Sequence, residues 1–173
     1  MTITIEKPII KETKLYVNLR NRTQPTMYIV VHCSATQNLE KYTWKDIDAM
    51  HRAKGWACIG YHYVIRTDGT IEEGRPLKAI GAHAKGYNNV SVGICLIGGI
   101  DANGKSVNNF THNQLMSLFN LVEWLKTDAL KPIAVNNLKV VGHRDLGAKK
   151  DCPCFDVIPW FTTMEQAYDS DNH

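Results

Sequence analysis

The chain has 173 residues, of which 44% are hydrophobic and 21% charged, a composition that is ordinary for one globular domain with a buried core. No apolar run approaches the roughly 18 residues that a membrane-spanning helix needs. Residues 1–10 lack the basic-then-apolar layout of a signal peptide, so we expect a cytoplasmic protein that does not enter the membrane. Five cysteines are an odd number, which argues against a disulfide framework.

The net charge of +3 is concentrated at the amino terminus. Residues 1–26 hold five basic and two acidic side chains, and the rest of the chain holds 15 of each sign. Because nucleic-acid-binding domains usually carry basic clusters on their body, we expect no direct nucleic-acid binding. We interpret residues 1–26 as a basic extension, 27–168 as a single domain and 169–173 as a tail.

The basic extension allows two interpretations. Hydrophobic and polar residues alternate over 2–5 and over 14–19, which predicts short strands. Such strands would pair with the edge of a sheet and extend the fold. Alternatively, the extension is an accessory surface that concentrates the protein on an anionic partner.

From residue 27 onward, strand and helix patterns follow one another. The continuous apolar run at 28–31 predicts a strand that is buried on both faces. Thr43 is expected to cap a helix that ends at Gly55. Residues 61–65 and 70–73 are then expected to form two strands joined by a hairpin turn.

The second half of the chain continues this alternation. Residues 90–97 predict another buried strand, and Thr111 opens the strongest helix with a capping box. Residues 138–141 predict a short strand, and 155–167 a terminal helix that is broken near Pro159. The order β-α-β-β-β-α-β-α indicates an α/β fold in which a central mixed β-sheet is flanked by about three helices.

Three residues of metal-ligating types occur at two strand ends and in the loop that follows the second of them. His32 follows the strand at 28–31, and His143 follows the strand at 138–141. Cys152 comes after an eight-residue loop that can fold back toward His143. Two imidazoles and a thiolate suit Zn²⁺ with a fourth position open to water. These residue types alone leave a second interpretation open. Both histidines could be strand-end residues whose hydrogen bonds are made within the protein, and Cys152 could be a buried residue that packs in the core.

Five motifs occur in an order that is typical of one enzyme family. They are VHCSAT (31–36), GYHY (60–63), AHAKGYN (82–88), SVGICLIGG (91–99) and KDCP (150–153). The sequence resembles the zinc-dependent N-acetylmuramoyl-L-alanine amidases over residues 27–162. It is most similar to the amidase-type lysozymes of T-odd coliphages, and more distantly to peptidoglycan recognition proteins.

The resemblance implies roles for particular residues. The zinc ligands of the family map onto His32, His143 and Cys152, and its catalytic tyrosine and lysine map onto Tyr61 and Lys150. Tyr61 would hydrogen-bond the reacting groups, and Lys150 would stabilise the oxyanion as a cation. The alternatives are that Tyr61 is a half-buried strand aromatic and that Lys150 is a solvated loop charge.

Two further residues carry open interpretations. His83 lies between small residues in a loop rich in glycine and asparagine, so we interpret it as a substrate-side or proton-transfer group, with a structural role as the alternative. Cys154 stands where the phage relatives commonly have serine, and it competes with Cys152 as the thiolate ligand. Cys33 and His62 are expected in the core.

The resemblance also implies a biological role. The expected function is that of a phage endolysin, which cleaves the bond between N-acetylmuramic acid and L-alanine in bacterial peptidoglycan. A monomer made in the host cytoplasm would reach the wall once a partner permeabilises the membrane. The resemblance further implies inhibition of the phage RNA polymerase. A binding module that grips muropeptide without cutting is the alternative, but such members typically lose the thiolate, and Cys152 is present.

Overall fold

The computed structural model describes residues 5–15 and 17–173 and contains a six-stranded mixed sheet. The strand order is β1-β4-β3-β5-β2-β6, and the pairing is parallel throughout except between β3 and β4. The strands are β1 (Ile10–Lys11), β2 (Thr26–Cys33), β3 (Tyr63–Ile65), β4 (Ile71–Glu73), β5 (Ser91–Leu96) and β6 (Ala134–Gly142).

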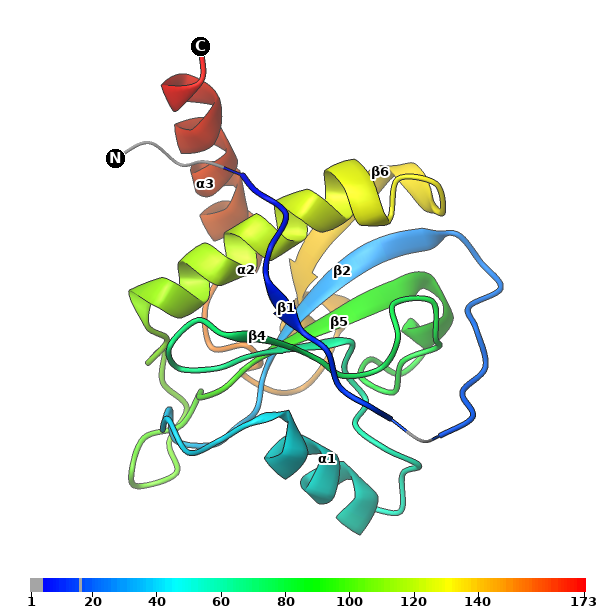
Figure 1. The fold of residues 1–173 in the computed structure, drawn as a ribbon. Coiled ribbons are helices and arrows are strands. Elements are labelled where there is room, and N and C mark those ends of the chain that lie inside the picture. The colour runs from blue at the N-terminus through cyan, green and yellow to red at the C-terminus, as the bar shows by residue number, and fades with distance from the viewer. Residues whose placement is uncertain (1–4, 16) are drawn as a thin grey trace.

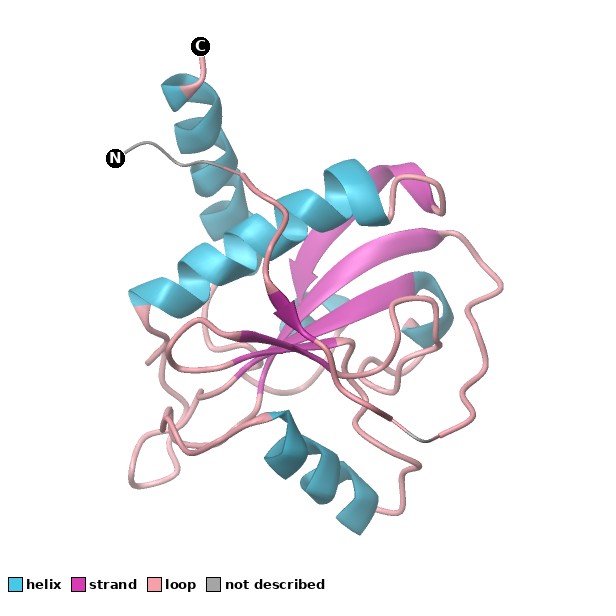
Figure 2. Ribbon diagram, in the orientation of Figure 1, coloured by secondary structure: helices cyan, strands magenta, loops and turns pink. Residues whose placement is uncertain are grey.

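Three α-helices in the described part of the chain cover the two faces of this sheet. They are α1 (Trp44–Ala53), α2 (His112–Trp124) and α3 (Val157–Asp171). Helices α2 and α3 lie on one side and α1 lies on the other (Figures 1 and 2). The expected α/β fold is therefore confirmed. Within residues 5–15 and 17–173, no helix is both long enough and apolar enough to cross a bilayer.

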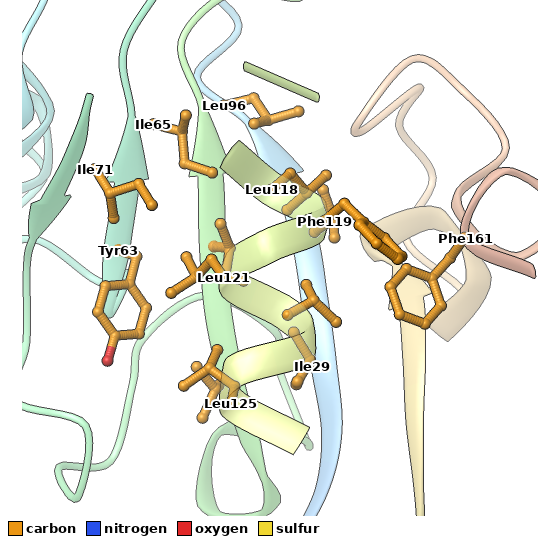
Figure 3. Close-up of a cluster of buried hydrophobic side chains, with 14 of the residues drawn as sticks. Ile29, Tyr63, Ile65, Ile71, Leu96, Leu118, Phe119, Leu121, Leu125 and Phe161 are labelled. Atoms are coloured by element: carbon orange, nitrogen blue, oxygen red, sulfur yellow. The ribbon is translucent and has the colours of Figure 1, made fainter. Parts of the chain in front are cut away.

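The larger core lies between the sheet and α2. Leu118 and Leu121 point from α2 toward the strands, and Phe119 packs against Phe161 of α3 with 5.6 Å between ring centroids (Figure 3). Burial of large apolar side chains of this kind stabilises a fold by about 1.5–3 kcal/mol each. Leu115, one turn earlier on α2, is only partly buried.

The two-residue period of the strands decides which side chains face α1. On β5, alternate residues such as Ile94 join the core under α2, whereas Cys95 joins a smaller cluster with Ile47 of α1. On β2, Ile29 and Val31 belong to the α2 side. Since successive strand residues point to opposite faces, His32 at the end of β2 faces the α1 side of the sheet.

The expected helix boundaries are largely confirmed. Thr43 and Thr111 both form capping boxes at the start of α1 and α2. The expected break near Pro159 is wrong: α3 is continuous because Pro159 occupies its first turn, where a missing N–H breaks no helical hydrogen bond.

The strand boundaries differ from expectation most clearly at β3 and β6, and by one or two residues at β2, β4 and β5. Tyr61 does not begin a strand, because β3 starts only at Tyr63, and Tyr61 lies in the segment that leads into it. Strand β6 runs from Ala134 rather than from residue 138.

The described part of the basic extension packs along the sheet edge. Ile10 of β1 pairs with Ile71 of β4, so β1 is an edge strand of the sheet, and the Ile80 amide donates to the Arg20 carbonyl at 2.8 Å. The Arg22 guanidinium donates to the carbonyls of Leu77 and Ala79 at 2.5 and 3.1 Å. These contacts favour the interpretation in which the extension adds to the fold.

The strands expected within this extension lie elsewhere. The expected strand at 2–5 falls outside the described residues except for Ile5, and the one expected over 14–19 is not formed in the described residues 14–15 and 17–19. The strand of the extension lies instead at residues 10–11, where it pairs with β4. Alternation of hydrophobic and polar residues within the extension does not predict this strand, because its position depends on the partner strand. The domain boundary at residue 26 stays a prediction.

Candidate active site

Parallel pairing of β2 with β6 brings two histidines together. Val30 is opposite Val141 and Val31 is opposite Gly142, so His32 and His143 come next at adjacent carboxyl ends. Their ring centroids are 4.5 Å apart. The carboxyl ends of parallel strands are a common place for functional groups, because the loops that follow them meet there.

The loop after His143 returns Cys152 to this position. A 3₁₀ turn over His143–Leu146 ends at Gly147, whose φ of 83° is left-handed and favours glycine. The Arg144 amide then donates to the Cys152 carbonyl at 2.9 Å, which closes the loop. The Cys33 amide donates to the Cys152 sulfur at 3.3 Å.

These residues form a cluster suited to a metal ion. One ligand atom from each of His32, His143 and Cys152 lies within 4.8 Å of the other two, and this is the one such group found among the described residues. Burial lowers the pKa of His32 well below its usual value. Burial, aided by the Lys150 charge, also lowers the pKa of His143. Both rings are therefore neutral near pH 7, the form in which histidine binds metals.

The second candidate thiol points away from the cluster. The Cys154 thiol donates to the Gly99 carbonyl at 3.3 Å and lies 3.9 Å from the Cys33 sulfur. Burial raises the pKa of Cys154 to about 12, which keeps this thiol protonated. Cys33 is buried as expected, but its amide contact with Cys152 also makes it part of the site.

The cluster lies in a cleft of about 740 Å³. This volume is within the range of sites for small molecules, about 300–1,000 Å³. Helix α1 and the loop after it supply one wall through Ile47, Met50 and Trp56, and Gly99 and Ser106 line the cleft as well. The cleft therefore combines an apolar wall with a polar floor.

Tyr61 and Lys150 both line this cleft. The Tyr61 ring centroid is 4.9 Å from that of His32, and burial raises the pKa of Tyr61 well above its usual value. Its hydroxyl therefore stays protonated and can donate a hydrogen bond. Lys150 is exposed at the cleft, whereas its neighbour Lys149 does not line it. The catalytic roles of Tyr61 and Lys150 stay predictions.

His83 also borders the cleft, but it contacts His32 directly. The His83 side chain is 8% exposed, and its Nδ1 lies 2.8 Å from His32 Nε2. Its assignment to substrate stays a prediction. His62 is fully buried as expected, accepts from the Gly93 amide at Nδ1 and lies 2.9 Å from the Ala79 carbonyl at Nε2.

Sequence reasoning missed His51 as a cleft residue. His51 lies on α1, lines the cleft, and accepts from the Gly60 amide at its Nδ1 at 2.8 Å. The helical spacing of Ile47, Met50 and His51 was visible in the sequence. What the spacing did not reveal is that this face of α1 forms a cleft wall, with Met50 37% exposed.

Two imidazoles and a thiol at the carboxyl edge of an α/β sheet, opening into a cleft, form a possible metal-binding site. A family profile described as N-acetylmuramoyl-L-alanine amidase matches residues 22–155. The chain belongs to this family, and it is an enzyme of the amidase class whose substrate is peptidoglycan.

Phage endolysins are similar along most of the chain. The endolysin of Klebsiella phage KP32 is 42% identical over 144 residues, which cover 83% of this chain and 91% of that protein. The endolysin of Escherichia phage T7 is 40% identical over 142 residues, covering 82% and 89%. The amidase LysC from Clostridium intestinale is similar in structure, with a TM-score of 0.72, 30% identity, and coverage of 96% and 99%.

Proposed function

We propose that this chain hydrolyses the amide bond between the lactyl carbonyl of N-acetylmuramic acid and L-alanine, with Zn²⁺ held by His32, His143 and Cys152. The observation that carries this proposal is the cluster of three ligand atoms within 4.8 Å at the floor of the cleft. A thiolate and two neutral imidazoles leave a bound zinc with net positive charge and one open position.

The donor set suits the chemistry that amide hydrolysis needs. When bound, Zn²⁺ supplies a Lewis acid and an activated water. Tyr61 donates a hydrogen bond toward the reacting oxygen atoms, and Lys150 stabilises the negative charge that develops on the amide oxygen.

Similarity to phage endolysins supports a role in host lysis. Under this proposal, the enzyme is made in the host cytoplasm and reaches the wall after another protein permeabilises the membrane. Inhibition of a phage RNA polymerase, which the family resemblance implied, stays a prediction.

Digestion of purified peptidoglycan tests the proposed reaction. We expect mass spectrometry to identify free stem peptides that begin with L-alanine, together with glycan strands that keep their length. A chelator should stop the reaction and added Zn²⁺ should restore it. Cleavage of glycosidic or peptide-crosslink bonds, or full activity after verified metal removal, would contradict the proposal.

Although the described backbone of the basic extension packs on the fold, its exposed cationic side chains are expected to strengthen binding to intact walls without affecting the chemistry. Lys7, Lys11, Lys14 and Arg20 are exposed, whereas Arg22 is bonded into the fold. Replacing the four exposed residues by glutamine should weaken sedimentation with walls at low salt, because screening shortens to about 8 Å at physiological ionic strength. Turnover of a small soluble muropeptide should persist; unchanged binding at low salt would refute the accessory role.

Deleting residues 1–26 altogether is a different experiment. It would also remove the Arg22 hydrogen bonds to Leu77 and Ala79 and the pairing of β1 with β4. We therefore expect the deletion to lower the melting temperature, which the glutamine variant should not do.

A further inference from the structure

A chain of buried hydrogen bonds runs from the backbone to His32. His32 Nε2 lies 2.8 Å from His83 Nδ1, and His83 Nε2 lies 3.1 Å from the Ser91 hydroxyl. The Ser91 hydroxyl donates to the Tyr87 carbonyl at 2.7 Å. His32 is 1% exposed and Ser91 is not exposed at all, so these groups depend on one another for hydrogen bonds.

The Tyr87 carbonyl fixes which group donates and which accepts in each of these hydrogen bonds. A carbonyl can only accept, so Ser91 donates to Tyr87 and accepts from His83 Nε2–H. In a neutral His83 ring, Nδ1 then carries no hydrogen and accepts from His32 Nε2–H. His32 is therefore left with a bare Nδ1, the nitrogen that lies 3.7 Å from the Cys152 sulfur.

The His83 ring is also held in place by close packing. A Cβ added at Gly93 would lie 2.7 Å from His83 Cγ, and one added at Gly81 would lie 2.5 Å from His83 Cδ2. Only glycine at these two positions leaves room for the ring. The Asn88 side chain accepts from the backbone amides of His83 and Ala84 at 2.8 and 3.0 Å, which fixes the segment that carries His83.

We propose that His83 is a positioning residue that holds His32 in the tautomer and orientation required to bind the metal through Nδ1. This inference rests on the metal site proposed above. Partners of this kind behind a ligating histidine are worth about 10- to 100-fold in metal affinity. The AHAKGYN and SVGI motifs, with Gly81 and Gly93, would then hold His83 in place behind the metal ligand His32. This role is separate from any contact that His83 makes with substrate.

The tautomer of His32 can be measured before any metal is added. Long-range ¹H–¹⁵N correlation spectra of the metal-free protein should show His32 with its proton on Nε2 and a bare Nδ1. A His32 ring protonated at Nδ1 would overturn the proposal. This readout does not involve zinc or activity, so it is separate from failure of the proposed function, which would appear as wild-type protein that binds no zinc.

Zinc affinity by chelator competition supplies the second test. His83→Phe keeps a ring but removes the acceptor, and we expect about 10- to 100-fold weaker zinc binding. His83→Asn can place an oxygen near the position of Nδ1 and should recover most of the affinity. His51→Phe is the matched control, because His51 is 7% exposed in the same cleft and its hydrogen bond goes to Gly60 rather than to a ligand.

The outcomes separate positioning from general loosening of the site. Affinity lost in His83→Phe, recovered in His83→Asn and unchanged in His51→Phe supports the proposal. Equal losses in His83→Phe and His51→Phe, or no loss in His83→Phe, would overturn it. Folding of each variant is checked by the dispersion of its amide spectrum.

Discussion

Cys152→Ser is expected to strip tightly bound zinc from the protein and to abolish hydrolysis of peptidoglycan. The Cys152 sulfur belongs to the three-atom cluster with His32 and His143, and a serine hydroxyl does not replace a thiolate as a ligand. Metal analysis after gel filtration, together with activity on purified walls, measures both effects.

Cys154→Ser is the matched control for this experiment. Cys154 lies two residues away, but its sulfur is directed to the Gly99 carbonyl and lies beside Cys33. We expect Cys154→Ser to retain zinc and most of its activity. If Cys154→Ser loses the metal and Cys152→Ser keeps it, the assignment of the thiolate ligand is wrong.

Tyr61→Phe and Lys150→Ala are expected to lower turnover strongly while zinc stays bound. Under the proposed mechanism, each change removes one group that stabilises or protonates the reacting atoms, and such groups typically contribute about 10²-fold or more. Turnover of a soluble muropeptide at saturating concentration, with zinc content verified for each variant, measures this loss.

Lys149→Ala provides the comparison for Lys150. Both lysines are exposed and adjacent in the chain, but only Lys150 lines the cleft. Lys149→Ala should therefore have nearly normal turnover. Normal turnover in Tyr61→Phe or Lys150→Ala would remove that residue from the mechanism.

Local patterns in the sequence were sufficient to predict most of the fold. Capping residues such as Thr43 and Thr111 act on their own helices, so the start of α1 and of α2 could be predicted. The pairing of Ile10 with Ile71 could not, because it joins segments that are far apart in sequence. The first turn of α3 tolerates Pro159, because at that position the helix requires neither the missing N–H nor a carbonyl four residues earlier.

Some residues of the candidate site could likewise be predicted from the sequence, whereas their contacts with one another could not. His32 and His143 could be anticipated because strand ends deliver them, and Cys152 because the motifs of the family resemblance include it. The contact between His32 and His83 could not be anticipated, because it needs the packing of the β5 strand under the loop that carries His83. His51 was missed for a similar reason: its helix position was visible, but its place on the cleft wall was not.

X-ray absorption at the zinc edge, on protein purified without added metal, tests the central claim most directly. The ligand cluster predicts one zinc per chain with one sulfur at about 2.3 Å and two imidazole nitrogens at about 2.0–2.1 Å. The remaining position should hold a light atom from water. A zinc bound by two sulfurs, or a fully active protein that contains no zinc, would contradict it.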